Sequence, residues 1–168
     1  MNPSLSTRNR NTAAALTDSD LDRVMAHARS LADSARKGIA PESLLRGRMI
    51  GLLCEADDTP GAVLFCRAAR ELGAHVAQVR PSLSERSTPS EVRHTADMLG
   101  RLYDALACEG MSATLVQQLG EHAGIPVYDG IASPQHPSAA LVERLEADAT
   151  PLDKRRYVLQ AVLLATLA

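Results

Sequence analysis

The sequence is poor in aromatic residues and has few cysteines. Its 168 residues include no tryptophan, one phenylalanine and three tyrosines. A core built from this chain must therefore be aliphatic, and so few rings argue against a stacking platform for single-stranded nucleic acid. The three cysteines, Cys54, Cys66 and Cys108, lack the CxxC spacing of a zinc module. Their odd number indicates free thiols in a reducing compartment, and we expect a cytoplasmic protein.

Long runs of one charge sign and long apolar runs are also missing. With 18 basic and 20 acidic residues, the formal net charge is −2. A nucleic-acid partner would need a basic face, whereas short basic clusters such as Lys154–Arg156 are interpreted as solvated helix surface. No apolar stretch approaches the roughly 18 residues of a membrane-spanning helix, and the N-terminus has no apolar signal-like segment. We therefore expect neither a nucleic-acid nor a membrane partner.

Hydrophobic patterning predicts an α/β protein. Residues 1–16 are polar at first and unpatterned, so we expect a mobile tail followed by one domain over residues 17–168. Short apolar strands alternate with helices, which favours a three-layer sandwich with a four-stranded parallel sheet flanked by helices. The predicted strands span 49–55, 75–79, 103–108 and 125–130, and the predicted helices span 18–36, 59–72, about 92–102, about 115–123, 136–147 and 152–167.

The loop after the first predicted strand is the most informative one. Ligands of parallel sheets bind beyond the carboxyl ends of the strands, and a helix start at that edge often holds a phosphate. Here the segment CEADDTPG (54–61) carries two carboxylates, Asp57 and Asp58, in that place. They could cap the helix and favour its dipole, or they could bind a cation.

Three segments together resemble the carbamoyl-phosphate domain of the aspartate/ornithine carbamoyltransferases, most closely the ornithine branch. They are LLRGRMIGLLCEADDTPGAVLFCRAARELGAHV (44–76), HTADMLGRLYDAL (94–106) and EHAGIPVYDGIASPQHPSAALVERL (121–145). The segment DKRRYVLQAVLLATLA (153–168) resembles the C-terminal helix of the same enzymes. The resemblance implies that the N- and C-terminal helices pack together on the domain.

The resemblance also implies that a second domain is missing. In the family, the domain that binds ornithine or aspartate lies between the segments that match residues 121–145 and 153–168. Here only a short break at residues 149–151 separates the helix predicted over 136–147 from the final one. We therefore expect the carbamoyl-phosphate-binding domain without an amino-acid-binding domain.

The phosphate-binding residues of the family are mostly replaced. The family motif Ser-Thr-Arg-Thr falls on residues 58–61, which keep only Thr59, and a family arginine falls on Glu109. The family His-Pro motif keeps His136, which in the family polarises the carbamoyl group, but lacks the glutamine that follows. The positions implied to contact a ligand are Asp58, Thr59, Pro60, Gly61, Glu109 and His136.

These replacements are large on the scale of binding energies. Losing two arginine contacts removes about 3–6 kcal/mol, and a carboxylate about 4 Å from a phosphate charge repels it by about 4 kcal/mol. A micromolar ligand has only about 8 kcal/mol to lose. We therefore predict a non-catalytic structural or regulatory oligomer without a cofactor. The resemblance implies a homotrimer, or a mixed assembly with a full-length carbamoyltransferase.

Two alternatives stay open. If Asp58, Glu109 and His136 face one space, they could hold a divalent metal or a cationic ligand, with His136 as a candidate catalyst of new chemistry. A partner chain could also supply the missing groups to a working carbamoyltransferase.

Overall fold

The computed structural model describes residues 17–168, so the tail expected over residues 1–16 lies outside the described residues. Four parallel strands form one sheet in the order β2-β1-β3-β4. The strands are β1 (Met49–Leu53), β2 (His75–Val79), β3 (Ala105–Cys108) and β4 (Val127–Asp129). The helices are α1 (Asp18–Arg36), α2 (Pro60–Glu71), α3 (Pro89–Leu102), α4 (Ala113–Ala123), the 3₁₀ helix η1 (Pro137–Arg144) and α5 (Pro151–Leu167).

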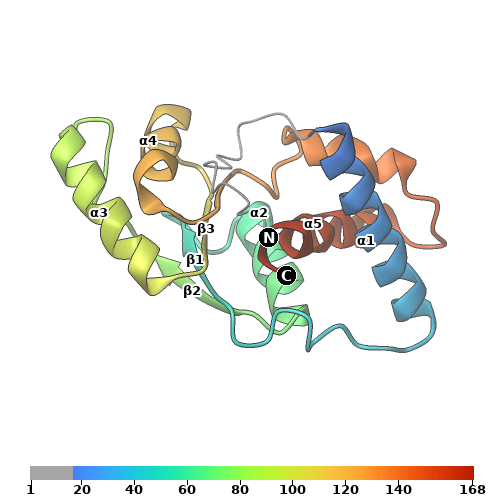
Figure 1. Ribbon diagram of the computed structural model, residues 1–168. Helices are drawn as coiled ribbons and strands as arrows, with labels where there is room; N and C mark the ends of the chain where they lie inside the picture. Colours follow the sequence, from blue (N-terminus) through green and yellow to red (C-terminus); the bar gives the residue numbers. More distant parts are fainter. Residues whose placement is uncertain (1–16) are drawn as a thin grey trace, which may run out of the picture.

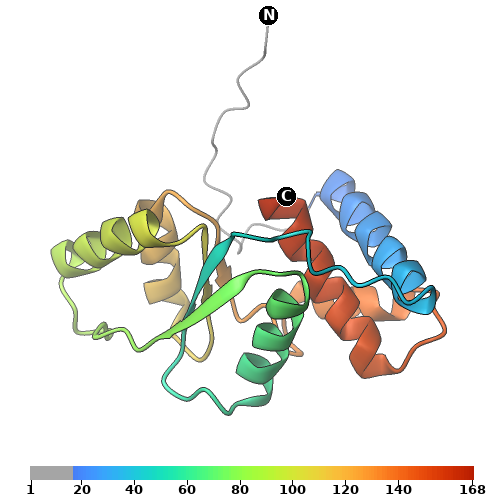
Figure 2. The same cartoon turned by 90° about the horizontal axis from the view of Figure 1, so that it is seen from below.

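Helices cover both faces of the sheet. In Figure 1, α3 and α4 lie on one side of the sheet, and α2, α5 and α1 lie on the other. Figure 2 shows α1 alongside α5, which it contacts along its length. The side chains of β1 divide between the two layers, since Ile50 and Leu52 join the core under α2 and α5 whereas Leu53 joins the core under α3 and α4. The predicted three-layer sandwich, with its first and last helices packed together, is confirmed.

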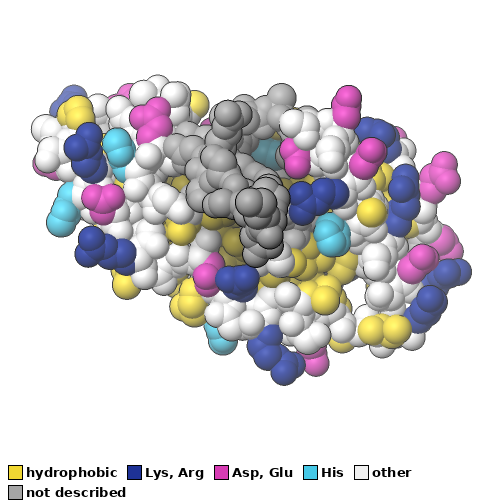
Figure 3. All heavy atoms as spheres, viewed as in Figure 1, with side chains coloured by type: hydrophobic (Ala, Val, Ile, Leu, Met, Phe, Trp, Pro, Cys, Tyr) yellow, Lys and Arg dark blue, Asp and Glu magenta, His cyan; other side chains and the backbone are white. Residues whose placement is uncertain are grey.

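The surface agrees with the even distribution of charges in the sequence. On the face drawn in Figure 3, lysine and arginine side chains are interspersed with aspartate and glutamate. Among the described helices, none is both long and apolar enough to cross a bilayer.

The strand order creates a topological switch point between β1 and β3. From β1 the chain runs outward to β2, then crosses to β3 and continues outward to β4. The connections that leave β1 and β3 therefore diverge, β1 leading into α2 and β3 into α4 on the opposite face. In open parallel sheets, ligands bind at this point, beyond the carboxyl ends of the two strands.

The helix ends follow the capping residues of the sequence. Thr59 caps α2, its side chain accepting a hydrogen bond from the Ala62 N–H at 3.2 Å, and Pro60 is the first helical residue. The helix predicted over 136–147 is present but shorter, because the chain forms a 3₁₀ helix that ends at Arg144. Its buried residues, Ser138 and Leu141, are three positions apart, which puts both on one face at three residues per turn.

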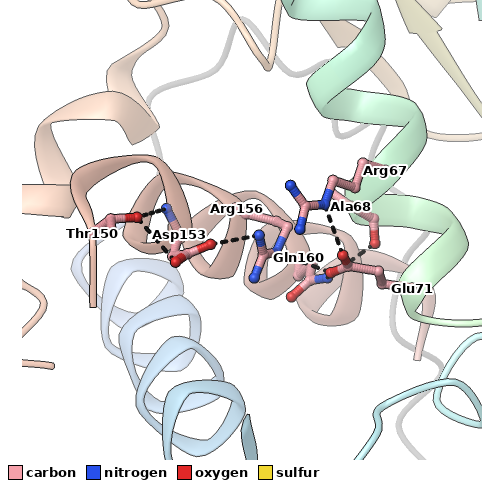
Figure 4. Close-up of polar contacts among 7 residues, drawn as sticks. All are labelled: Arg67, Ala68, Glu71, Thr150, Asp153, Arg156 and Gln160. Atoms are coloured by element: carbon pink, nitrogen blue, oxygen red, sulfur yellow. Dashed lines mark hydrogen bonds and ion pairs between the residues drawn. The ribbon is translucent and has the colours of Figure 1, made fainter. Parts of the chain in front are cut away.

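A polar network fixes α5 on α2 (Figure 4). The Arg156 side chain is buried, and its Nε lies 2.9 Å from Glu71 Oε2 as an ion pair without the alignment of a hydrogen bond. Its Nη1 donates to Asp153 Oδ1 at 2.6 Å. Gln160 donates to the Ala68 carbonyl at 3.1 Å and to Glu71 Oε2 at 3.0 Å. These contacts fix the position of the first turns of α5, which also carry Arg155.

We predict that Arg156→Ala lowers the free energy of unfolding by about 2–3 kcal/mol, because it leaves two carboxylates without their shared buried partner. The control is Arg67→Ala, because the Arg67 side chain is 56% exposed and pairs with the same Glu71. That change should cost less than about 1 kcal/mol. Urea unfolding followed by circular dichroism measures both variants. Equal losses would contradict the role of Arg156 in fixing α5.

Candidate functional site

The first turn of α2 lies at the switch point. Because Thr59 caps the Ala62 N–H and Pro60 has no N–H, Gly61 carries the first-turn N–H that has no partner among residues 17–168. The two carboxylates before the helix do not cap it. Asp57 and Asp58 are both exposed, and Asp58 forms no hydrogen bond or ion pair within the described part of the chain.

The Glu109 side chain reaches from the end of β3 to this first turn. Its Oε1 accepts a hydrogen bond from the Ala132 N–H at 3.4 Å. Its Oε2 lies 3.0 Å from the point that a Cβ on Gly61 would occupy, so the absence of a side chain there leaves room for the carboxylate. The start of a helix carries a partial positive charge. The half-buried carboxylate of Glu109 therefore lies where that charge favours an anion.

Arg155 brings a guanidinium from α5 to the same place. Its Nη1 donates to Ser138 Oγ at 3.2 Å, and its Nη2 donates to the carbonyls of Ile131 and Ser133. Its charge acts on both Glu109 and His136. The sequence interpretation of residues 154–156 as solvated surface is wrong for Arg155 and Arg156, which are turned inward. The cap at Thr150-Pro151 predicts where α5 begins, but it does not indicate which of its basic residues face the protein.

His136 caps η1 and is held by Ser138. Its Nδ1 accepts the Ser138 N–H at 3.2 Å and lies 2.7 Å from Ser138 Oγ. Since Nδ1 accepts, the neutral ring carries its proton on Nε2. Burial, together with the neighbouring Arg155 charge, lowers the pKa of His136 to about 4. The imidazole is therefore uncharged at neutral pH.

The charges of this group compensate one another in part. Burial raises the pKa of Glu109, and the nearby Asp129 acts in the same direction, whereas the Ala132 N–H and Arg155 oppose the shift. Burial lowers the pKa of Arg155, and Glu109 opposes that shift. We call Gly61, Glu109, Ala132, His136, Ser138 and Arg155 the switch-point cluster.

The structure brings together only part of the predicted site. The charge of Arg155 acts on the pKa of both Glu109 and His136, and the Glu109 carboxylate lies against the first turn of α2 at Gly61. Asp58 lies at the surface. Within residues 17–168, no group of three His, Cys, Asp or Glu side chains is arranged to hold a metal ion. Metal binding by Asp58, Glu109 and His136 thus stays a prediction that this geometry does not support.

The three cysteines add no reactive group to the cluster. All are free, as their odd number indicated, and all are buried. Burial, with the nearby carboxylates, raises the pKa of Cys108 to about 12. A thiol with so high a pKa is a poor nucleophile at neutral pH.

We predict that an NMR pH titration of the His136 ring gives a midpoint near 4. In the unfolded chain the pKa is about 6.5, so the unfolded state binds the proton first as the pH falls. His136 therefore reduces stability as the pH drops from about 6.5 to about 4. The variant His136→Asn should lack this part of the decline in urea unfolding. A ring midpoint near that of a free histidine would contradict the burial of His136 and the effect of the Arg155 charge on it.

Comparison with known proteins agrees with the resemblance in the sequence. The family model "Aspartate/ornithine carbamoyltransferase, carbamoyl-P binding domain" matches residues 8–147. The chain is 35% identical over 117 residues to an ornithine carbamoyltransferase of Actinobacillus pleuropneumoniae, a match that covers 68% of this chain and 35% of the relative. It is 35% identical over 133 residues to a catabolic ornithine carbamoyltransferase of Burkholderia pseudomallei, covering 77% of this chain and 39% of the relative. The chain thus spans well under half the length of these curated relatives.

Solved structures share the fold. Ornithine carbamoyltransferase from Pyrococcus furiosus superimposes with a TM-score of 0.63 at 24% identity, over 76% of this chain and 40% of that one. Aspartate transcarbamoylase from Trypanosoma cruzi, in complex with carbamoyl aspartate and phosphate, gives a TM-score of 0.62 at 21% identity, over 86% of this chain and 46% of that one.

Proposed function

Because the chain belongs to the aspartate/ornithine carbamoyltransferase family, as its carbamoyl-phosphate-binding domain, we propose that it has lost carbamoyl transfer and acts as a non-catalytic structural or regulatory oligomer. The observation that carries this proposal is the position of Glu109. Its carboxylate lies against the first turn of α2, where the family motif that falls on residues 58–61 would hold a phosphate.

The energetic argument is direct. A phosphate at the first turn of α2 would lie next to the Glu109 carboxylate, which repels it by about 4 kcal/mol at a separation of about 4 Å. Pro60 offers no N–H, and the Ala62 N–H is already bonded to Thr59. Binding would also have to displace the hydrogen bond between Glu109 and Ala132. Together these terms exceed half of the free energy of a micromolar complex, about 8 kcal/mol.

The short connection between η1 and α5 supports the loss of a binding site for the second substrate, ornithine or aspartate. Residues 145–150 alone join the two helices. The family resemblance implies that a whole amino-acid-binding domain belongs there, and α5 instead follows directly and packs on α1 and α2. In this proposal residues 17–168 act as one unit, with no site for ornithine or aspartate.

The geometry favours this proposal over a cation or metal site. Glu109 accepts the Ala132 N–H and feels the charge of Arg155, so its negative charge is compensated in part within the chain. The three acids of the loop before α2, which are Glu55, Asp57 and Asp58, are exposed and have no contact with His136 in the described part of the chain. A cationic ligand would therefore find only solvated carboxylates.

We predict that carbamoyl phosphate neither binds to the chain in isothermal titration nor raises its melting temperature, and that no citrulline forms with ornithine. A ligand at 100 times its dissociation constant would add about 2.7 kcal/mol of stability, which is easily measured. A full-length ornithine carbamoyltransferase serves as the positive control. Clear stabilisation of this chain by carbamoyl phosphate would contradict the proposal.

We also predict that the chain assembles, with a homotrimer as the expected form. Apolar side chains remain exposed at Met49 and on α3, where Met98 and Leu102 are 47% and 59% exposed and lie one turn apart. Size exclusion with light scattering should give about three times the 17.9 kDa mass of one chain. A strict monomer, both alone and mixed with a full-length carbamoyltransferase, would contradict an oligomeric role.

A further inference from the structure

The helix α1 is joined to the domain mainly through one neighbour, α5. Figure 2 shows α1 beyond α5, on the side away from the sheet. Its buried residues form a single stripe within the core that α5 shares, and they are Val24, Met25, Ala28 and Leu31. A hydrogen bond from Arg23 Nη2 to the Ala165 carbonyl, at 3.3 Å, also joins the two helices. Within residues 17–168, α1 packs on no other helix or strand to a comparable extent. The position of α1 therefore depends on α5 and on the segment that follows α1.

That segment is a short hinge, which we define as residues 37–41. The backbone N–H groups of residues 37–39 donate to carbonyls at the end of α1, not to the body of the domain. The chain meets the body at Glu42, whose carbonyl lies so close to Gly73 that no side chain would fit there. A hollow of about 340 Å³ lies between the hinge, α1 and the end of α5. The hinge is therefore not packed down onto the two helices that it adjoins.

The residues of the hinge allow it to extend. Gly38, with a φ of +71°, follows α1 in the left-handed conformation and has open space around it. Ala40 precedes Pro41, and a proline disfavours helical backbone at the residue before it. Fully extended, the chain from Arg36 to Glu42 spans about 20 Å. Such a hinge can turn back, as it does in the structure, or carry α1 to a neighbouring molecule.

We propose that in the oligomer α1 of one chain packs on α5 of a second copy of this chain, with the hinge crossing between the two. The contact between the helices stays the one seen in the structure, so the exchange needs no new complementary surface. This inference rests on the oligomeric part of the proposed function, and it names the elements that join the copies.

Apolar side chains beside the hinge favour a neighbouring chain at this place. Ile39 and Leu44 are 58% and 49% exposed, and both line the hollow together with Leu31 and Leu164. A hinge that turns back leaves this apolar surface in water. Where two chains meet at their hinges, the same side chains are shielded, which adds a hydrophobic contribution. The contact between α1 and α5 is equal in both forms, so the difference between them lies at the hinge.

The test links α1 to α5 chemically and asks whether the two helices belong to one chain. His27 and Ala168 border the same hollow from α1 and from the end of α5. Chains with His27→Cys are co-expressed with affinity-tagged chains that carry Ala168→Cys, and the purified oligomer is treated with a bismaleimide. Each maleimide adds one cysteine thiol across its C=C bond. Exchange predicts a covalent product that contains one chain of each kind.

The control replaces His27→Cys by Arg29→Cys. Arg29 is exposed and lies two positions further along α1, on the opposite side of the helix from His27. Because helices in contact hold their thiols at a high effective concentration, the His27→Cys mixture should give at least about tenfold more product than this control. If His27→Cys does not fold, Ser30→Cys takes its place, since Ser30 borders the same hollow.

Hinge length gives a second measurement. Inserting about six glycine and serine residues after Ala40 lets α1 turn back onto its own α5 more readily. The product that joins two chains should then fall at least about fivefold. The same insertion after Asp148, in the exposed connection before α5, is the control and should leave the yield unchanged.

Circular dichroism and melting temperature check the folding of each variant. The inference is overturned if the oligomer gives no product between chains while the double variant His27→Cys with Ala168→Cys is linked within one chain. Equal product in the Arg29→Cys control, or an unchanged yield with the longer hinge, overturns it as well. Each of these results leaves the oligomeric role intact, whereas a strict monomer would overturn the inference and that role together.

Discussion

The contact between the Glu109 carboxylate and the first turn of α2 determines what the switch point can bind. The parallel order of the sheet brings the ends of β1 and β3 side by side, and the side chain of Glu109, the residue after β3, lies against the helix that follows β1. Because Gly61 has no side chain, that residue can lie directly against the helix start. An acid in this position uses the positive end of the helix that an external anion would otherwise use.

Two consecutive residues of α5, Arg155 and Arg156, contribute to the charge balance of the site and to the stability of the domain. Arg156 pairs with Glu71 and Asp153 and fixes the helix on α2, whereas Arg155 holds the loop over residues 131–138, and its charge acts on Glu109. Since α5 packs against α1, α2 and η1, nine of its residues are buried and little of its surface is exposed to solvent. The guanidinium that balances Glu109 is thus supplied by the helix that holds the domain together.

Much of this could be predicted from the sequence, and the failures have physical causes. Thr59 and Pro60 mark the start of α2, and Glu109 follows an apolar strand, so both could be placed at the switch point. Asp58 was expected beside Glu109, but Thr59 takes the capping role and leaves Asp58 in solvent. Arg155 was missed because the direction of a helical side chain depends on how α5 packs, which local pattern does not encode. The 3₁₀ form of η1 depends likewise on burial of Ser138 and Leu141.

The central claim is that Glu109 is held in place by the chain itself and excludes external anions. The most direct measurement is a crystal structure of the unchanged chain grown in concentrated phosphate. The account predicts that the Glu109 carboxylate accepts the Ala132 N–H and lies against Gly61, with no ion at the start of α2. An ordered phosphate bound there by Arg155, with Glu109 turned into solvent, would contradict it.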